Sequence, residues 1–257
     1  MTLAYTISGL LVGLLVGLTG VGGGSLMTPL LTLMFGFSPA TAVGTDLAFA
    51  SLTKGVGTIA HRSHGHIRWD IVKLLCLGSL PAALVTVLVL KRMGNLDAEW
   101  MHLIRVTIGV SVILTVISLL FRQRVLGWLA RNPRYRLQGI TLAVATVIVG
   151  VVLGVLVTVS SIGAGAVGAT LILILYPELK SAEVAGTDIA YAVPLTAVAG
   201  LGHMYLGTID WNLLVSLLVG SIPGIWLGAR LSKNLPERLV RGALAATLTV
   251  TAIKLVS

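Results

Sequence analysis

Apolar residues in this chain gather into long runs that alternate with short polar loops. Several runs contain no charged residue, among them 74–90, 106–121, 140–159 and 213–227. A helix that crosses the hydrocarbon core of a bilayer needs about 20 mostly apolar residues. The pattern therefore predicts five transmembrane segments in each half of the chain, at 3–19, 25–36, 40–61, 69–90 and 101–121, then at 137–160, 166–176, 183–203, 211–229 and 239–256.

The composition is typical of an all-α polytopic membrane protein and excludes an ordinary soluble domain. Hydrophobic residues make up 56% of the chain and charged residues 11%, with a mean hydropathy of +1.00; soluble domains carry about 25% charged residues. The net charge of +9 is spread over short loops, which argues against nucleic-acid binding. The single cysteine, Cys76, lies within an apolar run, so we expect no disulfide framework, metal centre or cofactor.

One sequence pattern occurs twice and extends over most of each half. The triplet Gly44-Thr45-Asp46 returns as Gly186-Thr187-Asp188, 142 residues later. The same spacing pairs other positions: His61 with His203, Gly65 with Gly207, Trp69 with Trp211 and Pro81 with Pro223. A repeated plan in a membrane protein is typical of transporters, whose substrate site lies between the repeats. We expect residues 1–128 to form the first five-segment repeat and residues 129–257 the second.

Basic residues in the loops predict how the two repeats are oriented. Five arginines between residues 122 and 136 crowd the central loop, which the positive-inside rule places in the cytoplasm. Loop 62–68 carries Arg62 and Arg68, whereas the matching loop 204–210 carries Asp210 and no Lys or Arg. Matching loops of opposite charge character, with an odd number of crossings per half, predict an inverted 5+5 repeat with both termini outside.

The second segment of each half is too short to cross the membrane as one helix. Residues 25–36 would span about 18 Å, against a hydrocarbon core of about 30 Å. Each short segment follows a glycine cluster, which predicts a broken helix whose free N–H groups and positive dipole end can bind an anion. Close helix packing through small residues is the alternative. We expect substrate contacts at Gly22, Gly23, Gly24 and the helix cap Ser25, and at Gly163 and Gly165.

Asp46 and Asp188 lie several residues inside the third segment of each half. A carboxylate at membrane depth is costly, so it normally faces a cavity, a partner or a proton. We expect these two aspartates to couple transport to an ion, and the hydroxyls of Thr45 and Thr187 to donate to a substrate oxygen. A structural role as a cap on backbone N–H groups beside a glycine break is an equal alternative for the aspartates.

Lys54 departs from the repeat, because Thr196 stands at the matching position. Eight residues along a helix separate Lys54 from Asp46 by about 12 Å, which disfavours pairing within the helix. We expect the ammonium group to pair with Asp188 of the other half or to bind an anionic substrate.

Histidines offer a different chemistry. His61 and His203 match between the halves and fall at predicted helix ends, where we expect polar rings near the membrane surface. Together with His64 and His66, His61 forms a short cluster that a metal could use, although no acid or cysteine lies between its members.

These motifs resemble the TauE/SafE family of sulfite-exporter-like permeases. The resemblance rests on the glycine cluster leading to Pro29, on 43–47, 61–69 and 78–81, and on 184–189, 203–211 and 220–228 in the second half. It implies transport of small sulfur-containing or organic anions, such as sulfite and sulfoacetate, across the bacterial cytoplasmic membrane. The motif residues that it implies are Gly22–Gly24, Gly44–Asp46, Gly163, Gly165 and Gly186–Asp188. The chain is similar to a subset with Gly-Thr-Asp and Thr-Lys patterns, whereas the family often has Ser at the two aspartate positions.

Together these features predict a secondary transporter and not an enzyme, since no set of nucleophile, base and orienting group is visible. We expect it to move sulfite or an organosulfonate by alternating access with proton coupling, in the cytoplasmic membrane of a bacterium or archaeon. An anion channel on the same repeat is one alternative, and a carrier of divalent metal ions is another. A homodimer is compatible with the sequence, which specifies neither the oligomeric state nor the direction of transport.

Overall fold

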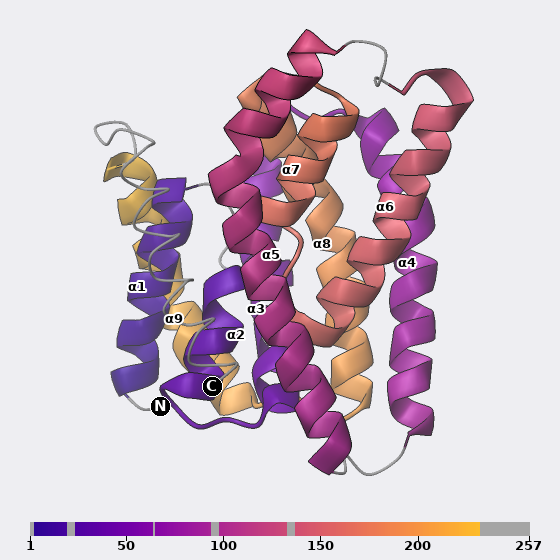
Figure 1. The fold of residues 1–257 in the computed structure, drawn as a ribbon. Helices are drawn as coiled ribbons and strands as arrows, with labels where there is room; N and C mark the ends of the chain where they lie inside the picture. The colour runs from indigo at the N-terminus through magenta and orange to yellow at the C-terminus, as the bar shows by residue number, and fades with distance from the viewer. Residues whose placement is uncertain (1–2, 20–23, 64, 94–97, 133–136, 232–257) are drawn as a thin grey trace.

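The computed structural model describes the chain except for residues 1–2, 20–23, 64, 94–97, 133–136 and 232–257. The described residues form helices joined by short loops, and the helices run along one common direction (Figure 1). The helices are α1 Leu3–Thr19, α2 Gly24–Leu33, α3 Pro39–Ser63, α4 Trp69–Arg92, α5 Ala98–Arg131, α6 Gly139–Ser160, α7 Ala166–Leu175, α8 Ser181–Tyr205 and α9 Trp211–Leu231.

Nine of the ten expected segments coincide with these helices, and the tenth, 239–256, lies outside the described residues. The largest difference is α5, which was expected at 101–121 and continues to Arg131. Residues 122–131 are rich in Arg, Leu, Gln and Ala and contain no proline, so the helix extends beyond the apolar run. Among the described helices, five are long and apolar enough to cross a membrane, which makes this a polytopic membrane protein.

The helices pair across the two halves of the chain. α1 packs along α9, α4 packs along α6, and α3 and α8 pack together in the centre (Figure 1). Glycines bring the outer pairs close: a Cβ on Gly9 would overlap the carbonyl of Leu217, and a Cβ on Gly150 would overlap that of Leu75. These are matching contacts, because Leu75 and Leu217 are 142 residues apart. The first helix of each half therefore packs on the fourth helix of the other through small residues.

Burial separates the central helices from the outer ones. On α6, the side chains of Ile140, Val144, Ile148 and Val152 are exposed at helical spacing, which suits contact with lipid tails. The central helices α3 and α8 instead carry buried polar side chains, those of Thr45, Asp46, Lys54, Thr187 and Asp188. Polar atoms at membrane depth must be satisfied or lie in a protected interior, so a transport site is expected between α3 and α8.

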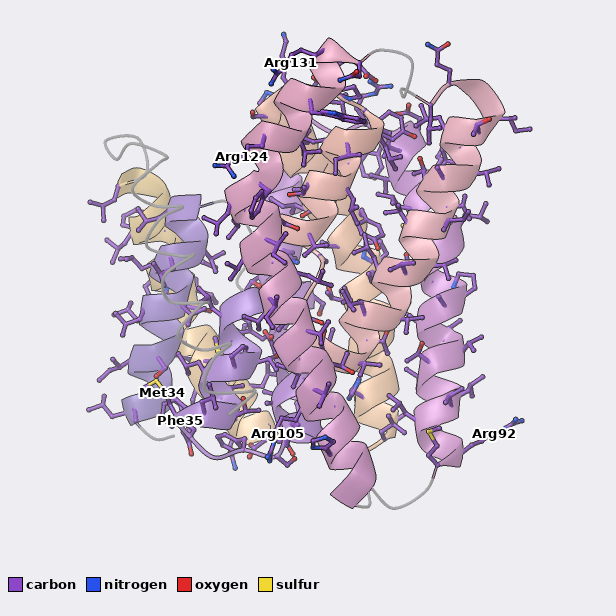
Figure 2. The ribbon with its side chains drawn as sticks, in the orientation of Figure 1. Met34, Phe35, Arg92, Arg105, Arg124 and Arg131 are labelled. Atoms are coloured by element: carbon purple, nitrogen blue, oxygen red, sulfur yellow. The ribbon has the colours of Figure 1, made fainter. Side chains whose placement is uncertain are left out.

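Charged side chains and the short helices distinguish the two ends of the bundle. Arg92 and Arg105 lie at the lower end in Figure 2, and Arg124 and Arg131 lie at the upper end. The short helix α2 occupies the lower half of the bundle and α7 the upper half (Figure 1). Each short helix therefore fills only part of the height of the bundle, and the N-terminal end of α7 lies inside the protein, where Ala166 is buried.

Candidate functional site

The connection between α6 and α7, residues 161–165, is a buried stretch of irregular backbone that we call the α6–α7 break. Ser161 has a φ of 58°, Gly163 of 132° and Gly165 of 138°. The two glycine values lie where side chains are strongly disfavoured, so glycine is required there. Ile162 donates its N–H to the hydroxyl of Ser160 at 3.2 Å, which replaces a helical bond at the end of α6. Helix α7 begins directly after the glycines, as the sequence predicts.

The matching region of the first half is only partly described. Gly22 and Gly23 lie outside the described residues. Helix α2 begins at Gly24, so Ser25 is its second residue and not the cap that we expected. The side chain of Ser25 is not among those that the structure describes.

Asp188, on α8, faces the N-terminal end of α7. Its side chain is 4% exposed, and its carboxylate lies beside the backbone N–H of Gly165. The Oδ1 atom has no hydrogen-bond partner and fills the space that a Cβ on Gly168 would need. The positive end of α7 thus meets a carboxylate of the protein itself, which is the capping role considered for this residue.

Asp46, on α3, is fully buried and faces α2. Its Oδ2 accepts a hydrogen bond from the hydroxyl of Thr28 at 2.6 Å. Its Oδ1 has no hydrogen-bond partner of good geometry, although the hydroxyl of Ser161 lies beside the carboxylate. Asp46 therefore lies between the short helix of its own half and the break of the other half.

Lys54, on α3, reaches the α6–α7 break. Its side chain is 6% exposed, and its Nζ donates a hydrogen bond to the carbonyl oxygen of Ala164 at 2.9 Å. Asp188 and Asp46 are both close enough to interact with it electrostatically. Neither forms a direct ion pair with it, because the described part of the chain has only one ion pair within 4.0 Å, between Arg68 and Asp70. The ion pair with Asp188 that we expected is therefore not formed here, and the ammonium binds the backbone instead.

These three residues, Asp46, Lys54 and Asp188, form what we call the central cluster. It holds two carboxylates and one ammonium group from α3 and α8, all buried around the α6–α7 break. Buried charges in a membrane protein mark functional sites, because their desolvation is costly. The sequence singled out all three residues, whereas it gave no sign of Thr28, Ser161 or the Ala164 carbonyl as their neighbours.

Thr45 and Thr187 each accept a hydrogen bond from a backbone N–H group, and the two contacts occupy matching positions in the two halves. The hydroxyl of Thr45 accepts the N–H of Asp210 at 3.1 Å, and that of Thr187 accepts the N–H of Arg68 at 3.0 Å. Asp210 and Arg68 are themselves 142 residues apart, so each threonine binds the loop of the opposite half. Each hydroxyl keeps its own hydrogen, which remains available to a second acceptor.

The glycine of each triplet makes these contacts sterically accessible. A Cβ on Gly44 would overlap the side chain of Thr208, and a Cβ on Gly186 would overlap the backbone of His66. Within each Gly-Thr-Asp triplet, the glycine admits the opposite loop, the threonine binds its backbone, and the aspartate turns toward a short helix. In the loop between α3 and α4, which lies outside the bilayer core, Arg68 donates hydrogen bonds to Asp70. These hydrogen bonds raise the pKa of the Arg68 guanidinium.

His203 lies in the last turn of α8, at a helix end as expected, and its ring is buried between helices. Its side chain is 3% exposed, with Nε2 at 2.9 Å from the carbonyl oxygen of Thr158 and Nδ1 at 2.9 Å from the hydroxyl of Thr208. It thereby joins the end of α8 to the last turns of α6, just before the break. The side chain of its counterpart His61 lies outside the described residues.

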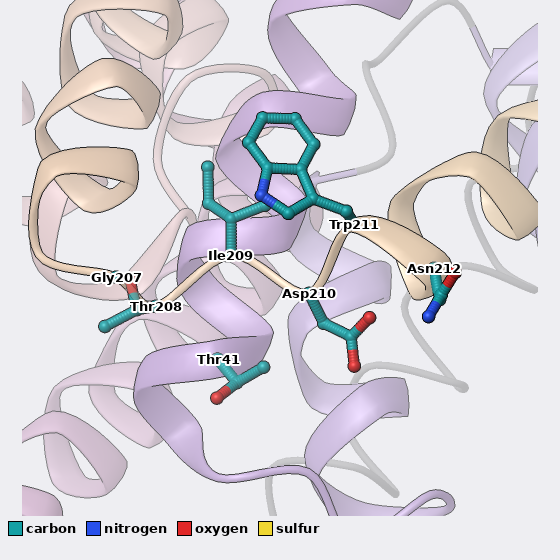
Figure 3. Close-up of a pocket in the computed structure, with 7 residues that line it drawn as sticks. All are labelled: Thr41, Gly207, Thr208, Ile209, Asp210, Trp211 and Asn212. Carbon is teal, nitrogen blue, oxygen red and sulfur yellow. The ribbon is translucent and has the colours of Figure 1, made fainter.

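A surface depression lies apart from the central cluster, where the α8–α9 loop crosses α3 (Figure 3). Its volume is about 430 Å³. The residues that line it are Thr41, Gly207, Thr208, Ile209, Asp210, Trp211 and Asn212. Asp210 caps α9 here by accepting the N–H of Leu213 at 3.0 Å. The depression lies beside the Thr45 contact and contains no residue of the central cluster.

The sequence of the chain is similar to those of known membrane transporters. Residues 5–255 match the family described as sulfite exporter TauE/SafE. The chain is 36% identical over 257 residues, the whole of both chains, to the probable membrane transporter protein YjnA of Bacillus subtilis. It is 30% identical over 248 residues to the probable membrane transporter protein YdhB of the same organism, covering 95% of this chain and 96% of that one. A probable membrane transporter protein of Xylella fastidiosa is 28% identical over 239 residues, covering 89% and 84% of the two chains. No solved structure matches the chain.

Proposed function

The chain belongs to the TauE/SafE sulfite exporter family, and from that premise we propose that it is a proton-coupled secondary transporter of a small anion, sulfite or an organosulfonate. The observation that carries this proposal is the central cluster, in which Lys54, Asp46 and Asp188 are buried around the α6–α7 break. Irregular backbone at membrane depth is tolerated where it lines a cavity or lies within protein, and transporters use it to bind substrates and ions.

Charge balance supports coupling to protons. Two carboxylates and one ammonium give the central cluster a formal charge of −1 when all three groups are ionised. An anion added to this site would make the formal charge −2 or more negative. So much negative charge in a poorly solvated interior is strongly unfavourable. At least one proton must therefore enter with the anion, and Asp46 or Asp188 is the group that can take it.

Lys54 supplies the attractive charge for the substrate. In the described conformation its Nζ is bound to a neutral carbonyl, which an anionic oxygen can displace because a charge-assisted bond is stronger. We assign the backbone of Gly22, Gly23, Gly24 and Ser25, and of Gly163 and Gly165, to the same substrate path. Protonation of Asp188 would weaken its attraction for the Gly165 N–H and release that donor for the anion. Thr45 and Thr187 would donate their free hydroxyl hydrogens once the halves have moved.

The two halves, 1–128 and 129–257, would form an inverted repeat that rocks about the central cluster. Supporting this, α1 begins at the lower end of the bundle and α6 at the upper end (Figure 1). The matching Thr45 and Thr187 contacts are what a two-fold relation between the halves produces. The proposed boundary falls within α5, which continues to Arg131. We assign the upper end, which carries Arg124, Arg131 and the basic central loop, to the cytoplasm, and the protein to the cytoplasmic membrane of a prokaryote.

Uptake into proteoliposomes tests the proposed function. Radiolabelled sulfoacetate is preferred to sulfite, because sulfite equilibrates with a neutral gas that crosses lipid unaided. With an imposed proton gradient, we expect accumulation above the external concentration for the native protein, and its loss in Asp188→Asn. Flux that only equilibrates the anion, with or without the proton gradient, would establish the channel alternative instead.

A further inference from the structure

The end of the Lys54 side chain lies close to where a small cation would be expected to bind. Its Nζ contacts the carbonyl of Ala164 in the unwound segment between α6 and α7. Unwound carbonyls of this kind coordinate coupling cations in transporters with broken helices. In the neighbouring residues of the central cluster and the α6–α7 break, three buried oxygen atoms have no hydrogen-bond partner: Oδ1 of Asp46, Oδ1 of Asp188 and Oγ of Ser161. Neither carboxylate lies within 4.0 Å of the Nζ, so a cation must settle between these oxygens and not at the position of the Nζ itself.

We propose that the Lys54 ammonium is a tethered substitute for a bound monovalent cation, and that shortening this side chain turns the position into a sodium site. The carbonyl, the two carboxylates and the hydroxyl are hard oxygen ligands of the type that alkali and alkaline-earth cations prefer. This inference rests on the proposed role of the central cluster. It adds which cation the cluster would bind in place of the Lys54 ammonium group.

Electrostatics favours a replacement cation once the ammonium is removed. With Lys54 replaced by a neutral residue, the ionised cluster carries a formal charge of −2 with no cation, all of it buried. Such a site either takes up protons or binds a cation from solution, since unpaired buried charge is costly. Sodium is the candidate, because Mg²⁺ gives up its waters reluctantly and is seldom bound by protein ligands alone.

The second half of the chain has no lysine at the position that matches Lys54. Thr196 stands where the repeat would place a second lysine, and its hydroxyl donates to Ala192 of its own helix at 2.8 Å. It is buried and carries no charge. The described part of the bundle therefore holds one such tethered cation. The cation belongs to Lys54 on α3, and it binds the α6–α7 break.

Thermal unfolding of the purified full-length chain in detergent tests this inference. Melting is followed in sodium chloride and in choline chloride at equal ionic strength. In Lys54→Ala we expect sodium to raise the Tm by several degrees in a saturable way, and Asp188→Asn added to this variant to abolish the effect. Lys54→Met is the matched control: it removes the same charge but fills the space, so its Tm should be equal in both salts.

Two outcomes would overturn the inference. One is an equal Tm of Lys54→Ala in both salts, or an equal sodium effect in Lys54→Met. The other is sodium-specific stabilisation of the native protein, in which the position is already filled. If Lys54→Ala does not fold, Lys54→Thr carries the same prediction, because the matching half tolerates threonine. Binding is measured without transport, so a sodium effect with no sulfoacetate uptake would refute the proposed function alone.

Discussion

The Nζ of Lys54 lies 2.9 Å from the carbonyl oxygen of Ala164, and this bond joins the middle of α3 to the break between α6 and α7. The two residues are 110 positions apart in the chain. A charged group from one half of the protein is thereby held at the interrupted helix of the other half. In the proposed mechanism, movement of the halves relative to each other would change this contact and so connect substrate binding to conformational change.

Replacement of Lys54 by Gln should strongly weaken substrate uptake. Gln keeps a donor for the Ala164 carbonyl but cannot attract an anion, and the loss of a charged hydrogen bond of about 1.5–3 kcal/mol corresponds to at least a tenfold fall in apparent affinity. The measurement is the concentration dependence of sulfoacetate uptake. Lys73→Gln is the control, since Lys73 is exposed on α4. Equal uptake by native and Lys54→Gln proteins would remove Lys54 from the substrate site.

Thr28→Val should destabilise the protein and disturb Asp46. The substitution keeps the shape of the side chain but removes the 2.6 Å hydrogen bond to the buried carboxylate. A buried acceptor left without this donor costs about 1–3 kcal/mol, which for a chain of this size lowers the Tm by about 2–4 °C per kcal/mol. Thr32→Val is the control, because Thr32 donates only to carbonyls of its own helix. Similar Tm losses in both variants would show that Thr28 has no special relation to Asp46.

Gly168→Ala should be harmful although alanine is the better helix former. Helix propensity alone predicts a gain of about 1 kcal/mol, but the new Cβ would overlap Oδ1 of Asp188 and displace that carboxylate from Gly165. We expect a lower Tm together with reduced uptake. Gly55→Ala provides the opposite case, since a Cβ there meets no atom within 4 Å, and its Tm should be unchanged or higher. A Gly168→Ala variant that is stabilised and fully active would show that the Asp188 carboxylate does not lie against Gly168.

Thr45→Val and Thr187→Val should destabilise the protein to a similar degree. Each removes the acceptor of one backbone N–H in a loop of the opposite half. An unsatisfied backbone donor costs about 1–3 kcal/mol where water cannot replace the partner. The check is the Tm of each single variant and of the double variant, whose loss should be close to additive if the two contacts are independent. A large effect at one position and none at the other would argue against equivalent halves.

Much of the architecture follows from the sequence because the apolar runs are long and free of charge. The helix positions and the irregular backbone at Gly163 and Gly165 needed only residue patterns. The same is true of the choice of Asp46, Asp188 and Lys54, since charge in an apolar segment is conspicuous in one dimension.

The partners of these residues were not predictable, because they depend on how the helices pack. Thr28 is an ordinary polar residue in α2 until α2 is placed against Asp46. The glycine break suggested free N–H groups for a substrate, whereas Asp188 arrives from α8 and lies beside one of them. His203 is near the end of a helix in sequence, yet α6 covers it. Each of these differences is a tertiary contact between segments far apart in the chain.

Simultaneous measurement of proton and anion movement tests the proposed coupling most directly. Proteoliposomes that enclose a pH-sensitive dye are given an inward gradient of sulfoacetate in sodium-free buffer. We expect the lumen to acidify as sulfoacetate enters, and both signals to be strongly weakened in Lys54→Gln and to disappear in Asp188→Asn. Sulfoacetate entry without acidification in the native protein, or acidification that persists undiminished in both variants, would contradict a proton-coupled anion site at the central cluster.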